Sequence, residues 1–277
     1  MKIKYIVKFA AMTSLFWGAA EMASAEQMFL KAKDYRPMVN TGANIQLLNG
    51  TFERSVSAVP FSRLKDVKVM AGEKTVHLTE SQWNSDKTSS YLSFNTEAPG
   101  TYTVGVSTKP RVIEMARDEF QEYMKYEGIN DALLKFQKES KLSTVRERYS
   151  KHVRAFLQVG DTKSDDYKQP LGHPLEIILE ENPYNLRFGK TVNFQVLLHG
   201  KPLSNQSVKA SYEGFHAHDK SGGHITSYDI RTDDQGRGSF LLSNKAVWYI
   251  SLISMQVVDD QEADYESNWA TVTFHVK

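Results

Sequence analysis

Three histidines in the second half of the chain have the spacing of a metal site: His216, His218 and His224. In a β-strand, residues two apart point to the same face and lie about 6.5–7 Å apart along the chain, so His216 and His218 could share one ion. The turn Ser221-Gly222-Gly223 would bring His224 back toward them. Three imidazoles suit a divalent transition metal such as nickel, cobalt, zinc or copper. The sequence therefore predicts a metal site in this segment.

Two carboxylates near these histidines could complete the ligand set, because Glu213 and Asp219 each offer an oxygen ligand. Two other interpretations stay open: a polar hairpin whose histidines bind nothing, and a loop whose histidines respond to pH. The remaining histidines are scattered, and we expect each to be a structural or surface residue: His77, His152, His173, His199 and His275.

Catalytic motifs are missing from the sequence. It contains no Gly-x-Ser-x-Gly nucleophile motif, no His-Glu-x-x-His zinc motif and no glycine-rich phosphate loop. We therefore expect a protein that is not an enzyme and has no catalytic residues. A carbohydrate-binding role would require a row of exposed aromatic side chains, whereas Trp83, Trp248, Tyr249 and Trp269 are more typical of a core.

The elements that must position the histidines are short β-strands separated by turns. From Leu171 to Lys277, apolar and polar residues alternate between turn signals such as Gly200-Lys201-Pro202. The predicted strands of this half are Leu175–Leu179, Val192–Leu198, Gln206–Tyr212, Ile225–Arg231, Gly238–Leu242, Ala246–Met255 and Ala270–Val276. The pattern predicts a C-terminal antiparallel β-sandwich over residues 171–277.

The first half has the same character over residues 26–110. Its predicted strands are Gln27–Lys31, Ile45–Leu48, Val67–Met70, Thr75–Leu78, Tyr91–Thr96 and Thr101–Ser107. A second antiparallel sandwich is therefore expected, and the fold class is predicted to be mainly β.

A helical insertion over residues 111–151 is predicted between the two sandwiches. Its apolar residues recur at three- and four-residue spacing, at Ile113, Ala116, Phe120 and Met124. The insertion could cover the open end of one sandwich and set the angle between the two, or it could act as a lid or docking arm. Residues 152–170 are expected to form a strand, Val153–Val159, and a polar linker.

The ends of the predicted helices follow from local signals. Gly128 is expected to end the first helix and Asn130 to cap the second. Thr144 and Glu147 have the spacing of a capping box, which predicts a third short helix.

Residues 1–25 have the three parts of a secretory signal. Lys2, Lys4 and Lys8 precede an apolar run from Phe9 to Ala20, which is too short to cross about 30 Å of hydrocarbon. The small residues Ala23-Ser24-Ala25 then form a cleavage site. We expect cleavage near Ala25, export to the periplasm, and no transmembrane segment after cleavage.

Composition narrows the possible partners. The formal net charge is +1 for 277 residues, and the leader carries three lysines and one glutamate, so the remainder is close to neutral. Nucleic acid is therefore an unsuitable partner. The chain has no cysteine, which excludes disulfides, thiolate ligands and a lipid-anchored cysteine.

Several short motifs resemble, in their order along the chain, those of one known family. They are Asn49-Gly50-Thr51-Phe52, Gly100-Thr101-Tyr102, Tyr149-Ser150-Lys151-His152, Val159-Gly160, Val192–Leu198, Gly200-Lys201-Pro202-Leu203, Val208, Thr232-Asp233 with Gly236, Trp248-Tyr249 and Trp269-Ala270-Thr271. This set resembles the DUF4198 family of exported bacterial proteins across essentially the whole mature chain. The resemblance implies immunoglobulin-like or transthyretin-like sandwiches and no known enzyme activity. Some members are described as periplasmic components of nickel or cobalt uptake.

The start of the mature chain departs from the family pattern. Many members begin with an Ala-His pair, but here Ala25 is followed by Glu26. A terminal amine next to a histidine would chelate copper or nickel, so this departure weakens a metal role for that end. The leading expectation is a non-enzymatic periplasmic binding or accessory protein that handles a divalent metal, with the metal ion or an envelope transport component as its partner. The alternatives are an envelope protein-interaction module without metal and a carbohydrate-binding sandwich.

Overall fold

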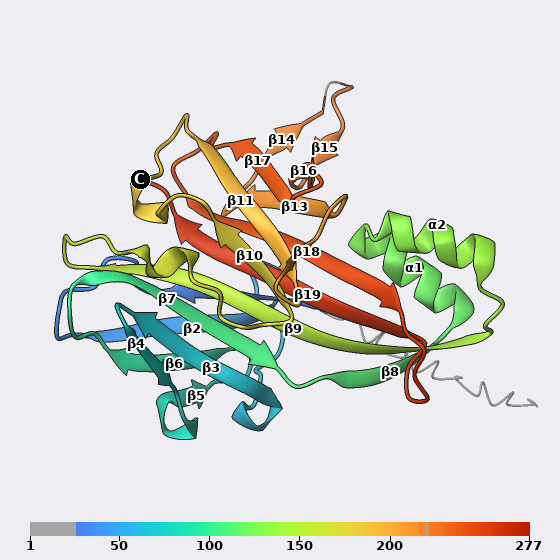
Figure 1. The fold of residues 1–277 in the computed structure, drawn as a ribbon, viewed down its shortest axis with the longest axis horizontal. Coiled ribbons are helices and arrows are strands. Elements are labelled where there is room, and N and C mark those ends of the chain that lie inside the picture. The colour runs from blue at the N-terminus through green and yellow to red at the C-terminus, as the bar shows by residue number, and fades with distance from the viewer. Residues whose placement is uncertain (1–25, 220) are drawn as a thin grey trace, which may run out of the picture.

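The computed structural model describes residues 26–219 and 221–277, and its fold is built mainly from β-strands (Figure 1). Within these residues, the largest unit is a nine-stranded sheet with the order β16-β13-β18-β19-β9-β7-β3-β4, in which β8 also pairs with β9. Its strands are β3 (Leu64–Ala71), β4 (Lys74–His77), β7 (Gly100–Thr108), β8 (Arg111–Ala116), β9 (Thr144–Val159), β13 (Ser207–Tyr212), β16 (Tyr228–Arg231), β18 (Val247–Val257) and β19 (Tyr265–His275). We call this unit the central sheet.

The two halves of the chain meet inside the central sheet. Strands β9 and β19 pair in parallel, from Glu147 opposite Tyr265 to Ala155 opposite Thr273. The other pairs of this sheet are antiparallel, for example β7 with β9 and β18 with β19. A mainly β fold is therefore confirmed, but both predicted halves contribute strands to one continuous sheet.

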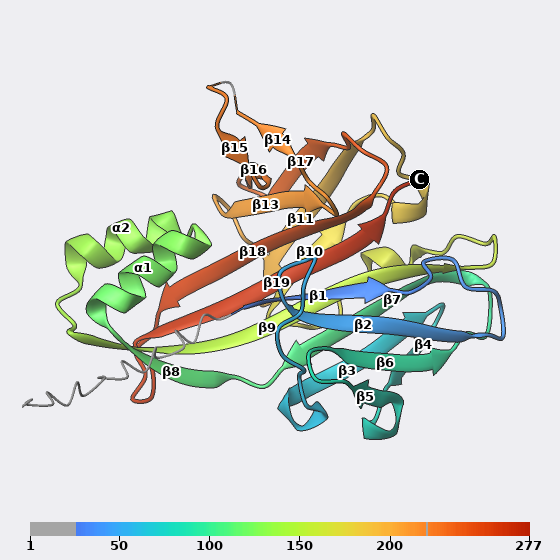
Figure 2. The ribbon, with the colours of Figure 1, turned by 180° about the vertical axis from the view of Figure 1, so that it is seen from behind.

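Two smaller sheets cover the opposite faces of the central sheet. One has the order β1-β2-β6-β5, formed by β1 (Gln27–Ala32), β2 (Gly42–Gly50), β6 (Ser90–Asn95) and β5 (Trp83–Ser85). The other joins β10 (Leu175–Leu179), β11 (Thr191–Leu198), β12 (Lys201–Pro202) and β17 (Arg237–Leu241). Figure 2 shows β1 and β2 in front of the central sheet, with β10 and β11 behind it.

The alternation of side chains along β9 explains the layers. Val153, Ala155 and Leu157 belong to the core beneath the β1-β2-β6-β5 sheet, whereas Phe156 belongs to the core beneath β10 and β11. Successive residues of a strand point to opposite faces, so one strand supplies both cores. Two hydrophobic cores therefore lie back to back across the central sheet.

Within the described residues, the α-helices span less of the chain than the predicted insertion over residues 111–151. They are α1 (Arg117–Glu127) and α2 (Asn130–Glu139), and they pack at the far end of the long strands β9, β18 and β19 (Figure 1). Phe120 and Phe136 are buried there against Tyr265 of β19. Gly128 ends α1 in the left-handed conformation, as predicted, because glycine adopts a φ of 74° without strain.

Three predictions for residues 111–151 are wrong. The stretch from Arg111 to Ala116, expected to begin the first helix, is strand β8 and pairs with β9. Asn130 is the first residue of α2, and Ile129 occupies the cap position. Thr144 and Glu147 begin strand β9 instead of a third helix, because they gain strand partners on both sides in β8 and β19. Such long-range pairing overrides a local capping signal.

The expected strand over Val153–Val159 is confirmed as the second half of β9, and a short 3₁₀ helix, Asp165–Lys168, interrupts the predicted linker. The predicted leader, residues 1–25, lies outside the described residues. Within the part of the chain that the structure describes, no helix combines the length and the apolar character needed to cross a bilayer.

Candidate functional site

The predicted histidines lie on a small hairpin that projects from the edge of the central sheet (Figure 1). Its strands are β14 (Ala217–His218) and β15 (His224–Ile225), inserted between β13 and β16. In the register, His218 is opposite His224 and Ala217 is opposite Ile225. We call residues 216–225 the histidine hairpin.

Aromatic side chains attach the histidine hairpin to the C-terminal core. The Phe215 ring lies 4.9 Å from the Tyr212 ring and 5.2 Å from the Tyr228 ring, measured between centroids. Tyr212 in turn packs on the buried Trp248 at 4.6 Å. These contacts fix the residue that immediately precedes His216, and so they fix where the hairpin begins.

Two of the three histidines are brought together by the structure. His216 and His218 are exposed, and their ring centroids lie 5.1 Å apart with the ring planes at 88°. Two imidazoles bound to one tetrahedral ion, each at about 2.0–2.1 Å, have centroids roughly 5 Å apart. The observed spacing therefore fits joint ligation, and it also fits an edge-to-face ring contact.

The third histidine is placed only by its backbone, because the side chain of His224 lies outside the described part of the structure. Its α-carbon is paired with that of His218 across the hairpin. Among the described side chains, no group of three or more histidines and carboxylates is placed to hold a metal ion.

The two carboxylates expected as additional ligands have other roles. Glu213 forms an ion pair with Lys31 of β1 at 2.7 Å. The Asp219 carboxylate accepts hydrogen bonds from the backbone nitrogens of Ser221 and Gly223, both at 2.8 Å, and from the Ser221 hydroxyl at 2.7 Å. These bonds lower the pKa of Asp219 and shape the turn between β14 and β15. Asp219 therefore orders the hairpin through its turn.

An open groove begins at the base of the histidine hairpin. It has a volume of about 640 Å³ and lies between the start of β1, the loop after β2, the end of α1 and the segment after β13. Its lining residues are mainly aromatic, acidic or small: Glu26, Gln27, Phe29, Gly50, Thr51, Phe52, Glu53, Val56, Tyr126, Glu127, Ser211, Gly214, Phe215, Thr226 and Tyr249. We call this the acidic groove.

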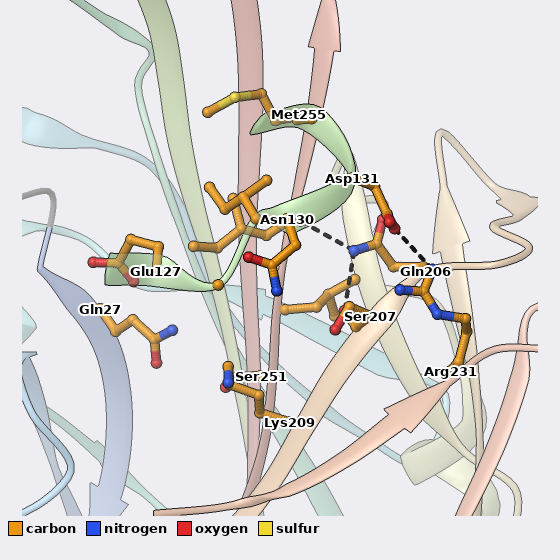
Figure 3. Close-up of a pocket in the computed structure, with 15 residues that line it drawn as sticks. Gln27, Glu127, Asn130, Asp131, Gln206, Ser207, Lys209, Arg231, Ser251 and Met255 are labelled. Atoms are coloured by element: carbon orange, nitrogen blue, oxygen red, sulfur yellow. Dashed lines mark hydrogen bonds and ion pairs between the residues drawn. The ribbon is translucent and has the colours of Figure 1, made fainter. Parts of the chain in front are cut away.

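A smaller pocket of about 90 Å³ adjoins the acidic groove and shares Gln27 and Glu127 with it. Figure 3 shows these two side chains on the same side of the pocket. On the other side, Arg231 of β16 pairs with Asp131 of α2 at 2.7 Å. This ion pair links the start of α2 to the edge of the central sheet, close to the acidic groove.

Buried ionisable groups surround Glu127 where α1 packs on β9 and β19. Glu147 is fully buried; its Oε1 accepts hydrogen bonds from the Tyr123 hydroxyl at 3.0 Å and from the Ser267 hydroxyl. Its Oε2 has no hydrogen-bond partner among the described residues. Burial raises the pKa of Glu147. The protonated form is favoured because an unpaired charge is costly in such surroundings.

Lys151 lies four residues further along β9, on the same face as Glu147. Its ammonium group donates to the backbone carbonyl of Glu26 and lies 5.3 Å from the Trp269 ring centroid. Burial lowers the pKa of Lys151 to about 8, against the attraction of Glu26 and Glu127. Burial also raises the pKa of Glu127 to about 7, and the charge of Lys151 opposes that change.

Sequence reasoning missed this buried group. The sequence predicts Glu147 in a capping box and Lys151 at the end of the helical insertion, whereas both are buried residues of strand β9. One signal in the sequence does indicate a strand here. Glu147, Tyr149 and Lys151 alternate with Arg146 and Arg148, and this alternation continues directly into the apolar strand that follows.

The comparisons with known proteins point to one family. A family model with the description "Domain of unknown function (DUF4198)" matches residues 23–256, which confirms the resemblance found in the sequence. No curated protein matches the chain.

Two solved structures are similar over most of this chain. They are Salmonella alpha-2-macroglobulin reacted with methylamine, at 11% identity, and Escherichia coli alpha-2-macroglobulin activated by porcine elastase, at 9% identity. The alignments cover 90% and 91% of this chain but 15% and 20% of those chains, each with a TM-score of 0.24. The chain thus spans at most a fifth of their length.

Proposed function

We propose that this chain, which belongs to the DUF4198 family, is an exported, non-enzymatic binding protein whose histidine hairpin holds a divalent transition metal. The observation that carries the proposal is the 5.1 Å separation of the His216 and His218 ring centroids on an exposed hairpin. The proposed ligands are His216, His218 and His224, because Glu213 and Asp219 are engaged in other contacts.

The chemistry of these ligands selects the metal class. Neutral imidazole nitrogens bind zinc, nickel, cobalt and copper, whereas calcium and magnesium prefer oxygen ligands. The hairpin is anchored by Phe215 at its base and by the Asp219 turn at its tip, so its backbone is partly ordered before binding. An exposed site on a short hairpin suits reversible capture of an ion.

The fold supports a finer proposal about domains. The two cores on opposite faces of the central sheet would correspond to two immunoglobulin-like or transthyretin-like sandwiches, over residues 26–110 and 171–277. In this proposal, β9 serves both sandwiches, and the helices α1 and α2 form the insertion between them. Export would depend on the predicted leader.

Isothermal titration of the metal-stripped mature chain with Ni²⁺, Co²⁺, Zn²⁺ and Cu²⁺ tests the metal proposal. We expect a dissociation constant of about 1 μM or lower for at least one ion. The double variant His216→Ala/His218→Ala should weaken that binding at least tenfold. Binding should also weaken at acid pH, since protonated imidazole does not ligate metals.

The matched control is His199→Asn. His199 is also exposed but lies on a different turn, with a φ of 50° that asparagine tolerates. This variant should bind as the wild type does. Equal affinity in the wild type and the double variant would refute the proposal, and unchanged binding in His224→Ala would remove His224 from the ligand set.

A further inference from the structure

The acidic groove has a one-sided charge composition. Its lining includes three carboxylates, Glu26, Glu53 and Glu127, but no lysine, arginine or histidine. None of these carboxylates forms an ion pair within the described part of the chain. Lys151 and Lys209 act on these carboxylates from outside the lining. The lining itself carries only carboxylates, and a concave surface of one sign attracts ligands of the opposite sign, so the groove favours a cation.

Aromatic rings form much of the remaining wall. Phe29, Phe52 and Tyr249 pack together with centroids 4.6–5.2 Å apart. Phe215 and Tyr126 also line the groove, and Tyr126 is 81% exposed at the end of α1. Phe29 and Phe52 are each 2% exposed, so the rings that a ligand can reach are those of Tyr126, Phe215 and Tyr249. Ring faces attract ammonium groups, and apolar walls accept the body of an organic ligand.

The chain itself gives an example of this recognition. The Lys31 ammonium lies 4.7 Å from the Phe52 ring centroid and pairs with the Glu213 carboxylate at 2.7 Å. A cation between an aromatic ring and a carboxylate is therefore already present beside the groove. The groove offers the same two kinds of group, with room for a separate molecule: its volume of about 640 Å³ is within the range of small-ligand sites.

From these observations we infer that the acidic groove binds a small organic cation, an ammonium compound with an apolar body. The ammonium group lies near Glu127 and Glu53, and the apolar body packs on Tyr126, Tyr249 and Phe215. This site is separate from the metal ligands, although Phe215 connects the groove to the base of the histidine hairpin. The inference goes beyond the proposed metal function and does not depend on it.

Calorimetric titration with choline tests the charge requirement. The matched probe is its uncharged analogue, in which a carbon atom replaces the nitrogen, so that shape is kept and charge is lost. We expect choline to bind with a dissociation constant below about 1 mM and the neutral analogue to bind at least tenfold more weakly. No binding of choline, or equal binding of the two probes, would overturn the inference.

Variants then locate the site. Glu127→Gln and Tyr126→Ala should each weaken choline binding at least fivefold. Glu122→Gln is the matched control, since Glu122 lies on the same helix, is exposed and does not line the groove. Choline binding that persists unchanged in both groove variants would refute this location. The metal affinity of the same variants should equal that of the wild type, so the test of the acidic groove is independent of the test of the histidine hairpin.

The pH dependence provides a second readout. Burial raises the pKa of Glu127 to about 7; Lys151 of β9 and Lys209 of β13 oppose this change, and Glu147 of β9 supports it. Burial also raises the pKa of Glu26, the residue before β1, and the charge of Lys151 opposes this change. Ionised glutamates attract the ligand, so choline binding should weaken several-fold from pH 8 to pH 6. Glu127→Gln should reduce this change, and an unaltered pH profile in that variant would contradict the assigned role of Glu127.

Discussion

The raised pKa of Glu127 has a consequence for folding that can be measured directly. Burial raises this pKa from 4.5 to about 7, so the folded chain holds the proton more tightly than the unfolded chain does. The resulting stability is fully present below pH 4.5 and is lost as the pH rises through 7. Glutamine keeps the shape of the side chain but has no such proton to lose. Glu127→Gln should therefore be more stable than the wild type at alkaline pH.

The size of the effect follows from the shift. A change of about 2.5 pKa units corresponds to a ceiling of about 3 kcal/mol at 1.36 kcal/mol per unit. Two features reduce it: Glu127 keeps some contact with solvent, and its charge supports the protonated form of Lys151. We expect a gain of about 2 kcal/mol at pH 8 and less than about 1 kcal/mol at pH 5. For a chain of this size, the gain at pH 8 corresponds to a rise in Tm of roughly 5 °C.

Urea unfolding at pH 5 and pH 8 measures this difference, with the exposed Glu122→Gln on the same helix as the control. The control should change stability by less than about 0.5 kcal/mol at either pH. An equal effect of Glu127→Gln at both pH values would refute the reasoning, because a purely steric or packing change does not depend on pH. The same variant should lose cation binding, so a more stable protein would bind choline less well.

Two further predictions concern the core. Burial lowers the pKa of His152 to about 4, so the neutral form of this side chain contributes stability that is fully present above pH 6.5. About 3 kcal/mol of that stability is lost as the pH falls toward 4. In urea unfolding over this range, His152→Gln should lose less stability than the wild type, and parallel pH profiles of the two proteins would contradict this. Gly105→Ala places a methyl group 2.5 Å from Leu171 Cδ1 and should cost about 1–3 kcal/mol in thermal or urea unfolding. Gly42→Ala, whose added methyl has no neighbour closer than 3.9 Å, should be nearly neutral, and equal costs in the two variants would count against the packing argument.

Local pattern was enough to locate most strands. The prediction for Leu175–Leu179 coincides with β10, and the strands predicted at Val67–Met70 and Thr75–Leu78 correspond to β3 and β4, which pair as a hairpin. These elements alternate or end in turn residues, and both signals act over a few residues. Their partners are also close in sequence, so little long-range information was needed.

The central sheet could not be predicted from such signals. The parallel pairing of β9 with β19 joins residues about 118 positions apart, such as Glu147 and Tyr265. This pairing decides that Thr144 and Glu147 are strand residues, and no local pattern encodes it. The same limit applies to the sites. The histidine spacing is local and readable, whereas the acidic groove is assembled from β1, the loop after β2, the end of α1 and the segment after β13.

Strand β9 carries several buried ionisable side chains that stability alone does not explain. Glu147, Lys151 and Arg154 are all buried on this strand, and Arg154 lies 3.5 Å from the buried Glu176. Replacing buried charges by apolar residues of similar volume is often neutral or stabilising, so stability alone does not explain their presence. Because this chain has no disulfides, its stability depends on its hydrophobic cores, where apolar residues contribute more than buried charges do. Glu147 and Lys151 act on Glu127 of the acidic groove: burial is the main cause of its raised pKa, which the charge of Lys151 opposes and the carboxyl group of Glu147 supports. Substitutions at Glu147 and Lys151 should therefore change the pKa of Glu127 as well as the stability of the fold, and both quantities can be measured on the same variants.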